Sequence, residues 1–550
     1  MTETARRRTV LIVLLVVAAC VFLLGINWGL PSRAVDPYLF GDRPVWSGEK
    51  IASLAPSDAA VLGADVDANP LRRDASIPIV LNDTDEKRAE IIRRYRLYSY
   101  QPDEMITFKS LSRINQFRGD PRLYQYGGLW MYPVGVMLKL ADVVGFVDLR
   151  GGPDGQAFYL DHPEAFGRFY IVARFYTAMW GLVGVWAVFW IVHRLTASDL
   201  AAAVGALCYT FMPVVVNMAH EAKPHLPGAV LMLLSVMAAT KYVETGKARW
   251  WVAAGALCGA AFAMVVSCLV GFVVLPVMTL LRRDAWPTRL RVTLAAAAVG
   301  FGVYFITNPY VLINAIVAPE ILQSNLSNST AMYGKRGIGG LPNALRLLLE
   351  ATSPFLVPLG AIGIARLIEL RKVGRKKGDV QDIPPILFPT AWLFLAPAAL
   401  IFAQFVLLAQ GKPGEYARFA LLPAIGFGIA TGFALSWCRH RAARAAFAIL
   451  AVGTTAAWGG AYLAGFVNDT GTDNTRLLLA EGIKRINGDI AVIAEPAPYS
   501  APPMNLFERR ILLVDPKDQT TPGWRVRAVD EEVARRSARA ALAAARAGVI

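Results

Sequence analysis

The chain has 550 residues, of which 55% are hydrophobic, and it carries a formal net charge of +15. This composition is typical of polytopic membrane proteins. The basic residues cluster in short loops between apolar stretches and not in a stripe with interleaved aromatics, which argues against nucleic-acid binding. The five cysteines lie in or beside apolar stretches without metal-ligand spacing, so we expect neither a disulfide framework nor a zinc site.

The apolar stretches predict an all-α polytopic membrane protein with about eleven transmembrane helices, because one span needs about 20 apolar residues. The first span covers residues 10–30 and follows three arginines at 6–8, which place the N-terminus in the cytoplasm. A long polar segment, 31–168, then lies outside. Basic loops place the later spans at 169–193, 200–219, 226–242, two short spans forming a hairpin within 250–281, 292–307, 344–368, 386–409, 419–437 and 444–466.

Two outer regions are too long to be simple connectors. The segment 31–168 is a large first loop, and its apolar stretch at 129–146 contains Pro, Lys and Asp, which favours a helix lying on the membrane surface over a span. The tail, 467–550, ends outside the membrane. We therefore divide the chain into a transmembrane domain, 1–466, and a C-terminal extracytoplasmic domain, 467–550.

The tail predicts a small α/β appendage. Residues 475–486 have a helical pattern, and the apolar runs at 489–495 and 509–515 are typical of strands. The Ala- and Arg-rich end, 530–550, is helical by propensity.

The stretch YSYQPDEMITF, residues 98–108, places two adjacent acids at the start of an amphipathic helix. One interpretation makes Asp103 the N-cap of this helix and Glu104 a dipole partner in its first turn. The alternative makes Asp103 a general base at the water–lipid boundary, because a helix N-terminus helps to keep a carboxylate ionised and oriented. The aromatic, Gly-bearing stretch at 122–133 can lie against the membrane nearby.

These features resemble the GT-C superfamily, integral-membrane glycosyltransferases that use polyprenyl-phosphate sugars. The nearest relatives look like the protein O-mannosyltransferases and bacterial enzymes of that kind. The resemblance rests on the short first span, the long loop with its acidic pair, and YQYGGLWMYP at 124–133. It continues through the block 172–234, ITNPYVLIN at 306–314 and EYARFALLPAIGFGIA at 415–430, and covers roughly residues 1–466.

The resemblance implies an inverting transfer of a sugar from a polyprenyl-phosphate donor to an acceptor hydroxyl of a glycan, lipid or protein. It places the reaction on the outer face of a bacterial inner (plasma) membrane. Asp103 then removes the hydroxyl proton, and Glu104 orients the acceptor or a divalent metal ion. The turn AHEAKPHLPG, 219–228, departs from the family, whose members often carry an Asp there.

Polar side chains near the outer span ends are candidates to bind the donor phosphate or a metal ion. Arg174 lies about 8 Å inside the outer end of its span, where an Arg usually faces a polar cavity or snorkels to the surface. Arg418 lies at the end of a predicted span. For the candidates that lie in loops, the alternative is that their side chains are simply solvated. The other candidates are Lys223, Lys335 and Arg336 for the phosphate, and His220, Glu221, His225, Tyr126 and Tyr132 as further members of the site.

Two other functions stay open from the sequence. A transporter or flippase of a lipid-linked sugar needs broken helices and ionisable residues near the midplane of the bilayer, and acids within the spans are nearly absent. A catalytically inactive GT-C relative, or a membrane scaffold, is the other alternative, because the turn at 219–228 is altered.

Overall fold

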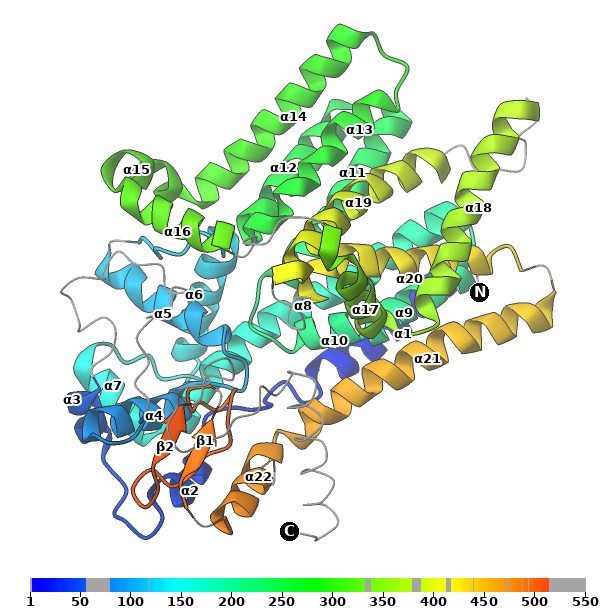
Figure 1. Cartoon of the computed structure of the whole chain (residues 1–550). Coiled ribbons are helices and arrows are strands. Elements are labelled where there is room, and N and C mark those ends of the chain that lie inside the picture. The colour runs from blue at the N-terminus through cyan, green and yellow to red at the C-terminus, as the bar shows by residue number, and fades with distance from the viewer. Residues whose placement is uncertain are drawn as a thin grey trace.

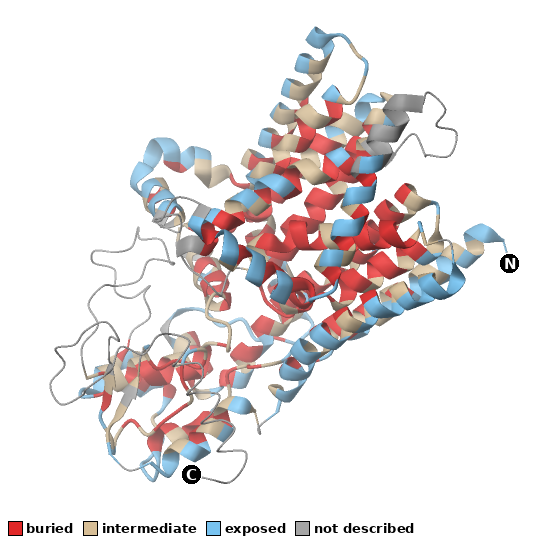
Figure 2. Cartoon of the chain, turned by 45° about the vertical axis from the view of Figure 1, so that its right-hand side comes forward, coloured by how far each residue is buried: buried red, intermediate tan, exposed pale blue. Residues whose placement is uncertain are grey.

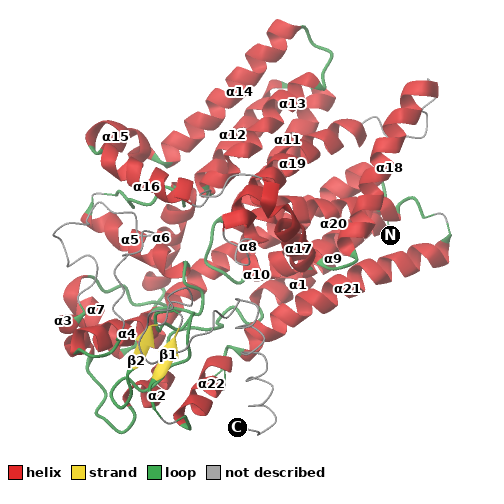
Figure 3. Cartoon of the chain, in the orientation of Figure 1, coloured by secondary structure: helices red, strands yellow, loops and turns green. Residues whose placement is uncertain are grey.

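The computed structural model describes most of the chain, and its regular structure is almost entirely helical (Figure 1). Two short strands lie together at one end of the molecule (Figure 3). The described residues are 2–55, 80–331, 338–377, 387–411 and 417–513, apart from positions 118, 439, 472–473, 487 and 493.

Among the described residues, six helices are long and apolar enough to cross a membrane, so the chain is a multi-pass membrane protein. The spans lie in α8 (Pro163–Thr196), α11 (His225–Thr245), α14 (Trp286–Thr307), α19 (Leu387–Gly411), α20 (Leu421–Leu435) with η4 (Ala417–Ala420), and α21 (Arg441–Asn468). Two bent pairs raise the number to eight if each pair is one span. They are α9 (Asp199–Phe211) with α10 (Pro213–Ala219), and α17 (Leu341–Thr352) with the start of α18 (Leu356–Lys377).

The predicted helical membrane architecture is therefore confirmed, whereas the predicted number of eleven spans is not. The predicted first span forms α1 (Glu3–Leu23), whose three arginines reduce its apolar length. The predicted hairpin at 250–281 forms α12 (Ala248–Met264), η2 (Val266–Val273) and α13 (Val274–Leu280), each too short to cross alone. The third predicted span bends by 59° between α9 and α10. Pro213 at the bend lacks the N–H that would continue the helix.

The core of the helical bundle lies around α8, α9, α11 and α20. Within the 18-residue apolar stretch of each helix, 83% of the residues of α11 and 78% of those of α20 are buried inside the protein, whereas the share is 17% in α14 and in α21. Figure 2 shows the buried residues gathered in the middle of the bundle. We infer that the exposed apolar faces of α14 and α21 are turned toward lipid.

The first long loop and the tail pack together into one globular unit at the end of the bundle (Figure 1). Asn82 donates to the carbonyl of Leu506 at 2.9 Å and accepts from the backbone N–H of Ile511 at 2.8 Å. The rings of Phe40 and Phe507 stack at 5.7 Å. The unit contains η1 (Arg33–Val35), α2 (Asp36–Phe40), α3 (Gly48–Leu54), α4 (Asp85–Leu97), α7 (Gly152–Asp161), α22 (Thr475–Lys484), β1 (Ile490–Val492) and β2 (Ile511–Leu513).

The tail has its helix and strands where the sequence predicts them. The two strands are parallel, with Ile490 opposite Ile511, and Val80 of the first loop forms a bridge to Leu512. The helix predicted at 530–550 lies outside the described residues. Because a strand pair this short is not stable alone, we infer that the tail depends on the first loop for its fold.

The remaining helices lie in two segments, one within the first long loop and one between α14 and α17. Helix α6 (Gly128–Val143) covers most of the stretch predicted as a surface helix, and its exposed apolar residues include Val136, Leu140 and Val143. Its position on a membrane surface stays a prediction. Helix α5 (Glu104–Gln116) precedes α6 in the first long loop. The segment between α14 and α17 contains α15 (Pro309–Val317), α16 (Pro319–Ala331) and η3 (Ile338–Gly340).

Candidate functional site

Asp103 lies at the start of α5 but does not act as its cap. Its backbone is helical, with φ −78° and ψ −14°, and its side chain accepts no N–H of the helix. Its carboxylate instead contacts two cations from distant parts of the chain. Oδ2 of Asp103 lies 2.6 Å from Nη1 of Arg418 and 3.1 Å from Nζ of Lys223. Asp103 therefore holds the predicted N-cap position, with Glu104 in the first turn, but it makes no capping hydrogen bond. The predicted base and two predicted phosphate ligands meet at one point instead.

The two cations dominate the electrostatics of Asp103. Burial acts to raise the pKa of this carboxyl, but the charges of Lys223 and Arg418 outweigh it and hold the pKa far below its usual range. The side chain of Asp103 is 27% exposed, whereas that of Lys223 is 1% exposed. The carboxylate is therefore ionised at any physiological pH and remains reachable from solvent.

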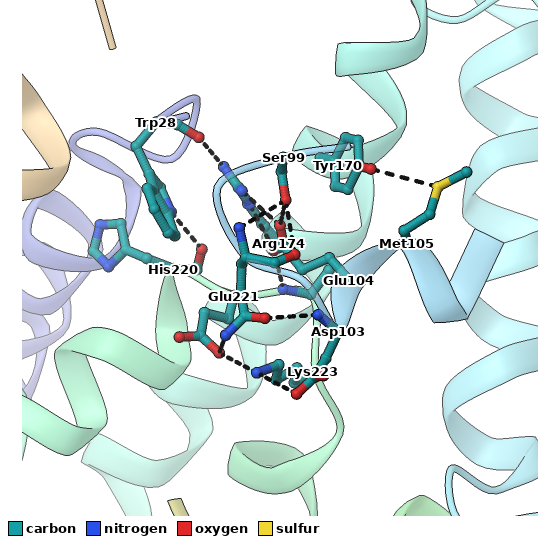
Figure 4. Close-up of polar contacts among 12 residues, drawn as sticks. Trp28, Ser99, Asp103, Glu104, Met105, Tyr170, Arg174, His220, Glu221 and Lys223 are labelled. Carbon is teal, nitrogen blue, oxygen red and sulfur yellow. Dashed lines mark hydrogen bonds and ion pairs between the residues drawn. The ribbon is translucent and has the colours of Figure 1, made fainter. Parts of the chain in front are cut away.

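Lys223 is held in place by a second acid. Its Nζ lies 3.0 Å from Oε2 of Glu221, which is 5% exposed. Glu221 in turn accepts hydrogen bonds from Asn217 at 2.9 Å and from Gln101 at 3.3 Å. The turn between α10 and α11 thus presents its lysine between two carboxylates, those of Asp103 and Glu221 (Figure 4).

Glu104 faces the other way and is fully buried. It forms a two-pronged ion pair with Arg174, at 2.8 and 2.7 Å, and accepts from Ser99 at 2.5 Å and from the backbone N–H of Ala222 at 2.7 Å (Figure 4). Arg174 also donates to the backbone carbonyls of Ile26 and Trp28 at 2.9 and 2.7 Å.

Both members of this pair are 0% exposed. The carboxylate of Glu104 already accepts four hydrogen bonds from the protein, and the guanidinium of Arg174 already donates to protein acceptors. This geometry favours a structural role for the pair over direct contact with a donor phosphate.

The two histidines of the turn at 219–228 have different surroundings. His220 is enclosed, with its ring nitrogens 2.7 and 2.9 Å from the carbonyl oxygens of Val216 and Leu24, and its ring stacks on Phe466. His225 begins α11 and lies edge-to-face with Tyr126 and Phe419. His220 therefore stabilises the protein interior, whereas His225 belongs to the surroundings of Arg418.

A metal site in this turn finds no support in the geometry. Within the described part of the chain, no group of three or more His, Cys, Asp or Glu side chains is placed to hold a metal ion. The space between the carboxylates of Asp103 and Glu221 is occupied by the ammonium of Lys223.

Tyr132 does not join the site that contains Tyr126. The hydroxyl of Tyr132 donates to the carbonyl of Gly119 at 3.1 Å, beyond the far end of α5 from Asp103. Lys335 and Arg336, predicted to bind the phosphate, lie outside the described residues.

A small cavity with an amphiphilic lining opens beside Arg418. Its empty volume, which includes space open to solvent, is about 320 Å³. Polar groups of Arg418, His225, Gln404 and Ser267 share the lining with apolar side chains. The apolar lining residues are Ala229, Met232, Val265, Cys268, Ile401, Phe419, Leu421 and Leu422. Such a cavity suits a ligand with an anionic head and an apolar chain.

Gln404 and Ser267 were not among the predicted site residues. Gln404 lies within the apolar helix α19, and a polar side chain inside a span is a signal of function that could have identified it. Ser267 lies in η2, just after the end of α12, and nothing in its sequence surroundings indicates a function.

Two adjacent glycines bring the stretch YQYGGLWMYP against the bundle. A Cβ at Gly127 would lie 2.1 Å from the carbonyl oxygen of Ala263, and one at Gly128 would lie 1.8 Å from that of Thr307. The N–H of Gly127 donates to the carbonyl of Met264 at 2.9 Å. Any side chain here would push this segment, and Tyr126 with it, away from the bundle.

Part of the chain matches a known protein family. Residues 164–312 match the model of the dolichyl-phosphate-mannose-protein mannosyltransferases. The matched part contains Arg174 and the turn at 219–228 but neither Asp103 nor Arg418. A search of curated proteins finds no significant match.

Several solved structures show weak overall similarity to the chain. ArnT from Cupriavidus metallidurans in the apo state is 14% identical, with 78% of this chain and 85% of that chain covered and a TM-score of 0.46. ArnT bound to undecaprenyl phosphate is 17% identical, with 76% and 84% covered and a TM-score of 0.44. The apo oligosaccharyltransferase of Archaeoglobus fulgidus is 12% identical, with 92% and 65% covered and a TM-score of 0.42.

The family match and the sequence resemblance agree on the class of protein. Over residues 164–312 the chain is similar to the dolichyl-phosphate-mannose-protein mannosyltransferases, and its resemblance to the GT-C superfamily of membrane glycosyltransferases is confirmed.

Proposed function

We propose that the protein is an inverting glycosyltransferase that moves a sugar from a polyprenyl-phosphate donor to an acceptor hydroxyl. One observation carries the proposal: Asp103 is paired with Arg418, and Arg418 also lines the amphiphilic cavity. A base, a phosphate-binding cation and an apolar cavity thus adjoin one another. We further propose that this site lies at the outer face of a bacterial inner membrane, with the N-terminus inside and the C-terminus outside.

The proposed reaction uses Asp103 as the base. The hydroxyl oxygen of the acceptor attacks the anomeric carbon and forms the new C–O bond, while Oδ of Asp103 takes the hydroxyl proton. The bond between the anomeric carbon and the phosphate oxygen breaks, and its electron pair stays on the departing lipid phosphate. Arg418 and Lys223 stabilise this charge, which is the role that oriented cations have for a leaving group.

The ion pairs of Asp103 suggest an order of binding. In the free protein both cations contact its carboxylate, so its pKa lies far below the usual range and it is a weak base. A donor phosphate that binds Arg418 and Lys223 shares their charge and lets the pKa of Asp103 rise. The donor therefore binds before the acceptor, and its binding makes Asp103 a stronger base for the proton of the acceptor hydroxyl.

Glu104 and Arg174 are proposed as positioning residues. Their buried ion pair connects the start of α5 with α8, and Ala222 extends the contact to the turn that carries Lys223. The pair thus fixes the separation of Asp103 and Lys223. We propose this role in place of the direct contacts with acceptor, metal ion or phosphate that the sequence predicts for these two residues. Lys335 and Arg336 stay proposed phosphate ligands.

A direct test measures sugar transfer from a synthetic polyprenyl-phosphate sugar by the purified protein. Asp103→Asn is expected to lower kcat about 10²- to 10⁴-fold, which is the usual contribution of a general base. Asp142→Asn serves as a control, since this acid pairs with the exposed Lys139 away from the site. Full activity of Asp103→Asn would remove Asp103 from the mechanism.

The same preparation separates the proposal from its two alternatives. Movement of the lipid-linked sugar across sealed vesicles without any transfer product would favour a flippase. Binding of the donor without turnover for any acceptor would favour an inactive relative.

A further inference from the structure

The imidazole of His225 is held in a fixed place beside the cations. The ring of Tyr126 meets it edge-to-face at 5.8 Å and 90°, and that of Phe419 at 5.2 Å and 82°. The residue is 5% exposed and lines the same cavity as Arg418. Because two aromatic rings hold it, the imidazole cannot turn away from this position at low cost.

His225 has an unused hydrogen-bonding atom. Its Nδ1 is buried and has no hydrogen-bond partner among the residues that the structure describes. A buried polar atom that stays unsatisfied destabilises the protein, and buried polar atoms in native proteins are nearly always paired. The missing partner is therefore expected to come from a ligand of the cavity.

The surroundings define the chemistry of that partner. Arg418 and Lys223 supply positive charge at His225, and the opposing charge of Asp103 is already paired with both cations. Cys268 is a further titratable group of the cavity lining, and the remaining lining is largely apolar. A cationic partner is disfavoured by the two neighbouring cations, whereas an anionic oxygen on an apolar chain fits.

We propose that His225 donates a hydrogen bond from its ring N–H to the phosphate of the sugar-lipid donor, a role that rests on the proposed function. A neutral imidazole is sufficient, because one ring nitrogen carries a hydrogen and no third positive charge is needed beside Arg418 and Lys223. The hydrogen bond satisfies the buried atom only when the donor is present.

The bond strengthens during the reaction. When the bond from the anomeric carbon to the phosphate oxygen breaks, its electron pair adds one negative charge to the phosphate, while the acceptor proton goes to Asp103. His225 transfers no proton and stabilises the added charge through its N–H. Because this charge develops in the transition state, the contribution of His225 belongs mainly to kcat and less to donor affinity.

Two variants of His225 separate the hydrogen bond from the shape of the ring. His225→Phe keeps an aromatic ring between Tyr126 and Phe419 but removes the donor, and it is expected to lower kcat about 100-fold with little change in KM for the donor. His225→Asn places an amide N–H close to where Nδ1 lies, and it is expected to recover activity to within about tenfold of the wild type. Thermal unfolding of both variants verifies that they are folded.

A binding assay gives a second readout that does not depend on turnover. A short-chain polyprenyl phosphate is the leaving group and carries the added negative charge, so it is expected to bind the wild type more tightly than His225→Phe, with His225→Asn in between. Inorganic phosphate is expected to bind weakly and equally to all three, because it lacks the apolar chain that the cavity holds. The inference would be overturned if the ratio of the affinities for the polyprenyl phosphate and for inorganic phosphate were the same in the wild type and in His225→Phe.

The outcomes distinguish this inference from the proposed function. Wild-type activity that is retained in His225→Phe overturns the role of His225 and leaves the glycosyltransferase proposal intact. A folded His225→Asn that is as inactive as His225→Phe also overturns it, because the ring and not the donor would then matter. A wild type that neither binds the lipid phosphate nor transfers sugar overturns both.

Discussion

The shared ammonium of Lys223 is the feature whose removal should disturb the site most. Its Nζ lies 3.1 Å from Asp103 and 3.0 Å from Glu221, so the two carboxylate oxygens are at most about 6 Å apart. At an effective dielectric constant of about 20, two negative charges at that distance repel by about 3 kcal/mol. Lys223→Met removes the cation between them and is expected to lower the free energy of unfolding by about 3–5 kcal/mol, as for other broken buried pairs.

A second substitution tests whether charge is the cause. Glu221→Gln in the Lys223→Met background removes one of the two repelling charges, and it is expected to restore about 3 kcal/mol of the lost stability. Thermal or denaturant unfolding in detergent, for wild type, both single variants and the double variant, gives the coupling energy directly. A double variant that is no more stable than Lys223→Met would refute the shared-cation reasoning, because the loss would then come from packing.

Three further predictions follow from the same cluster. Glu104→Gln leaves the buried Arg174 without its counter-charge and is expected to cost about 3–5 kcal/mol in thermal unfolding, whereas Asp142→Asn at an exposed pair should cost less than about 1 kcal/mol; equal losses would contradict the structural role of Glu104. The pKa of Asp103 is depressed in the free protein. The ion pairs of its carboxylate therefore still stabilise the fold when the pH falls below the ordinary pKa of about 4, and this stabilisation is lost only as the pH falls through the depressed value. The acid limb of kcat, which reports the donor complex, should therefore lie at higher pH than that of kcat/KM, and coincident limbs would contradict the sharing of cations. Removal of divalent metal ions with a chelator is expected to leave the transfer rate unchanged, because Lys223 fills the place between Asp103 and Glu221; restoration of a lost rate by Mg²⁺ or Mn²⁺ would contradict this.

The local pattern of the sequence was sufficient to predict most of the elements. The helix that follows Asp103, the bundle of apolar helices and the tail strands near 490 and 511 all lie where the pattern places them. These features depend on runs and periods within one segment, which are visible in the sequence. The number of spans was predicted less well, because bends at residues such as Pro213 and breaks at residues such as Val265 depend on neighbouring helices.

The different roles of the two adjacent acids could not be predicted in this way. Successive residues on a helix point about 100° apart, so Asp103 faces Lys223 and Arg418 while Glu104 faces Arg174. In the sequence the two acids are simply adjacent, and no local pattern distinguishes their roles.

The sequence by itself determined which side chains were available: an acidic pair at a helix start, a lysine in a turn, and an arginine at a span mouth. Only the tertiary structure decided their partners, because the arginine lies 315 residues along the chain from its acid. It also decided the position of the His225 imidazole, since the rings that hold it come from two other segments. Contacts across such separations depend on how the helices pack, and no spacing within a single segment encodes them.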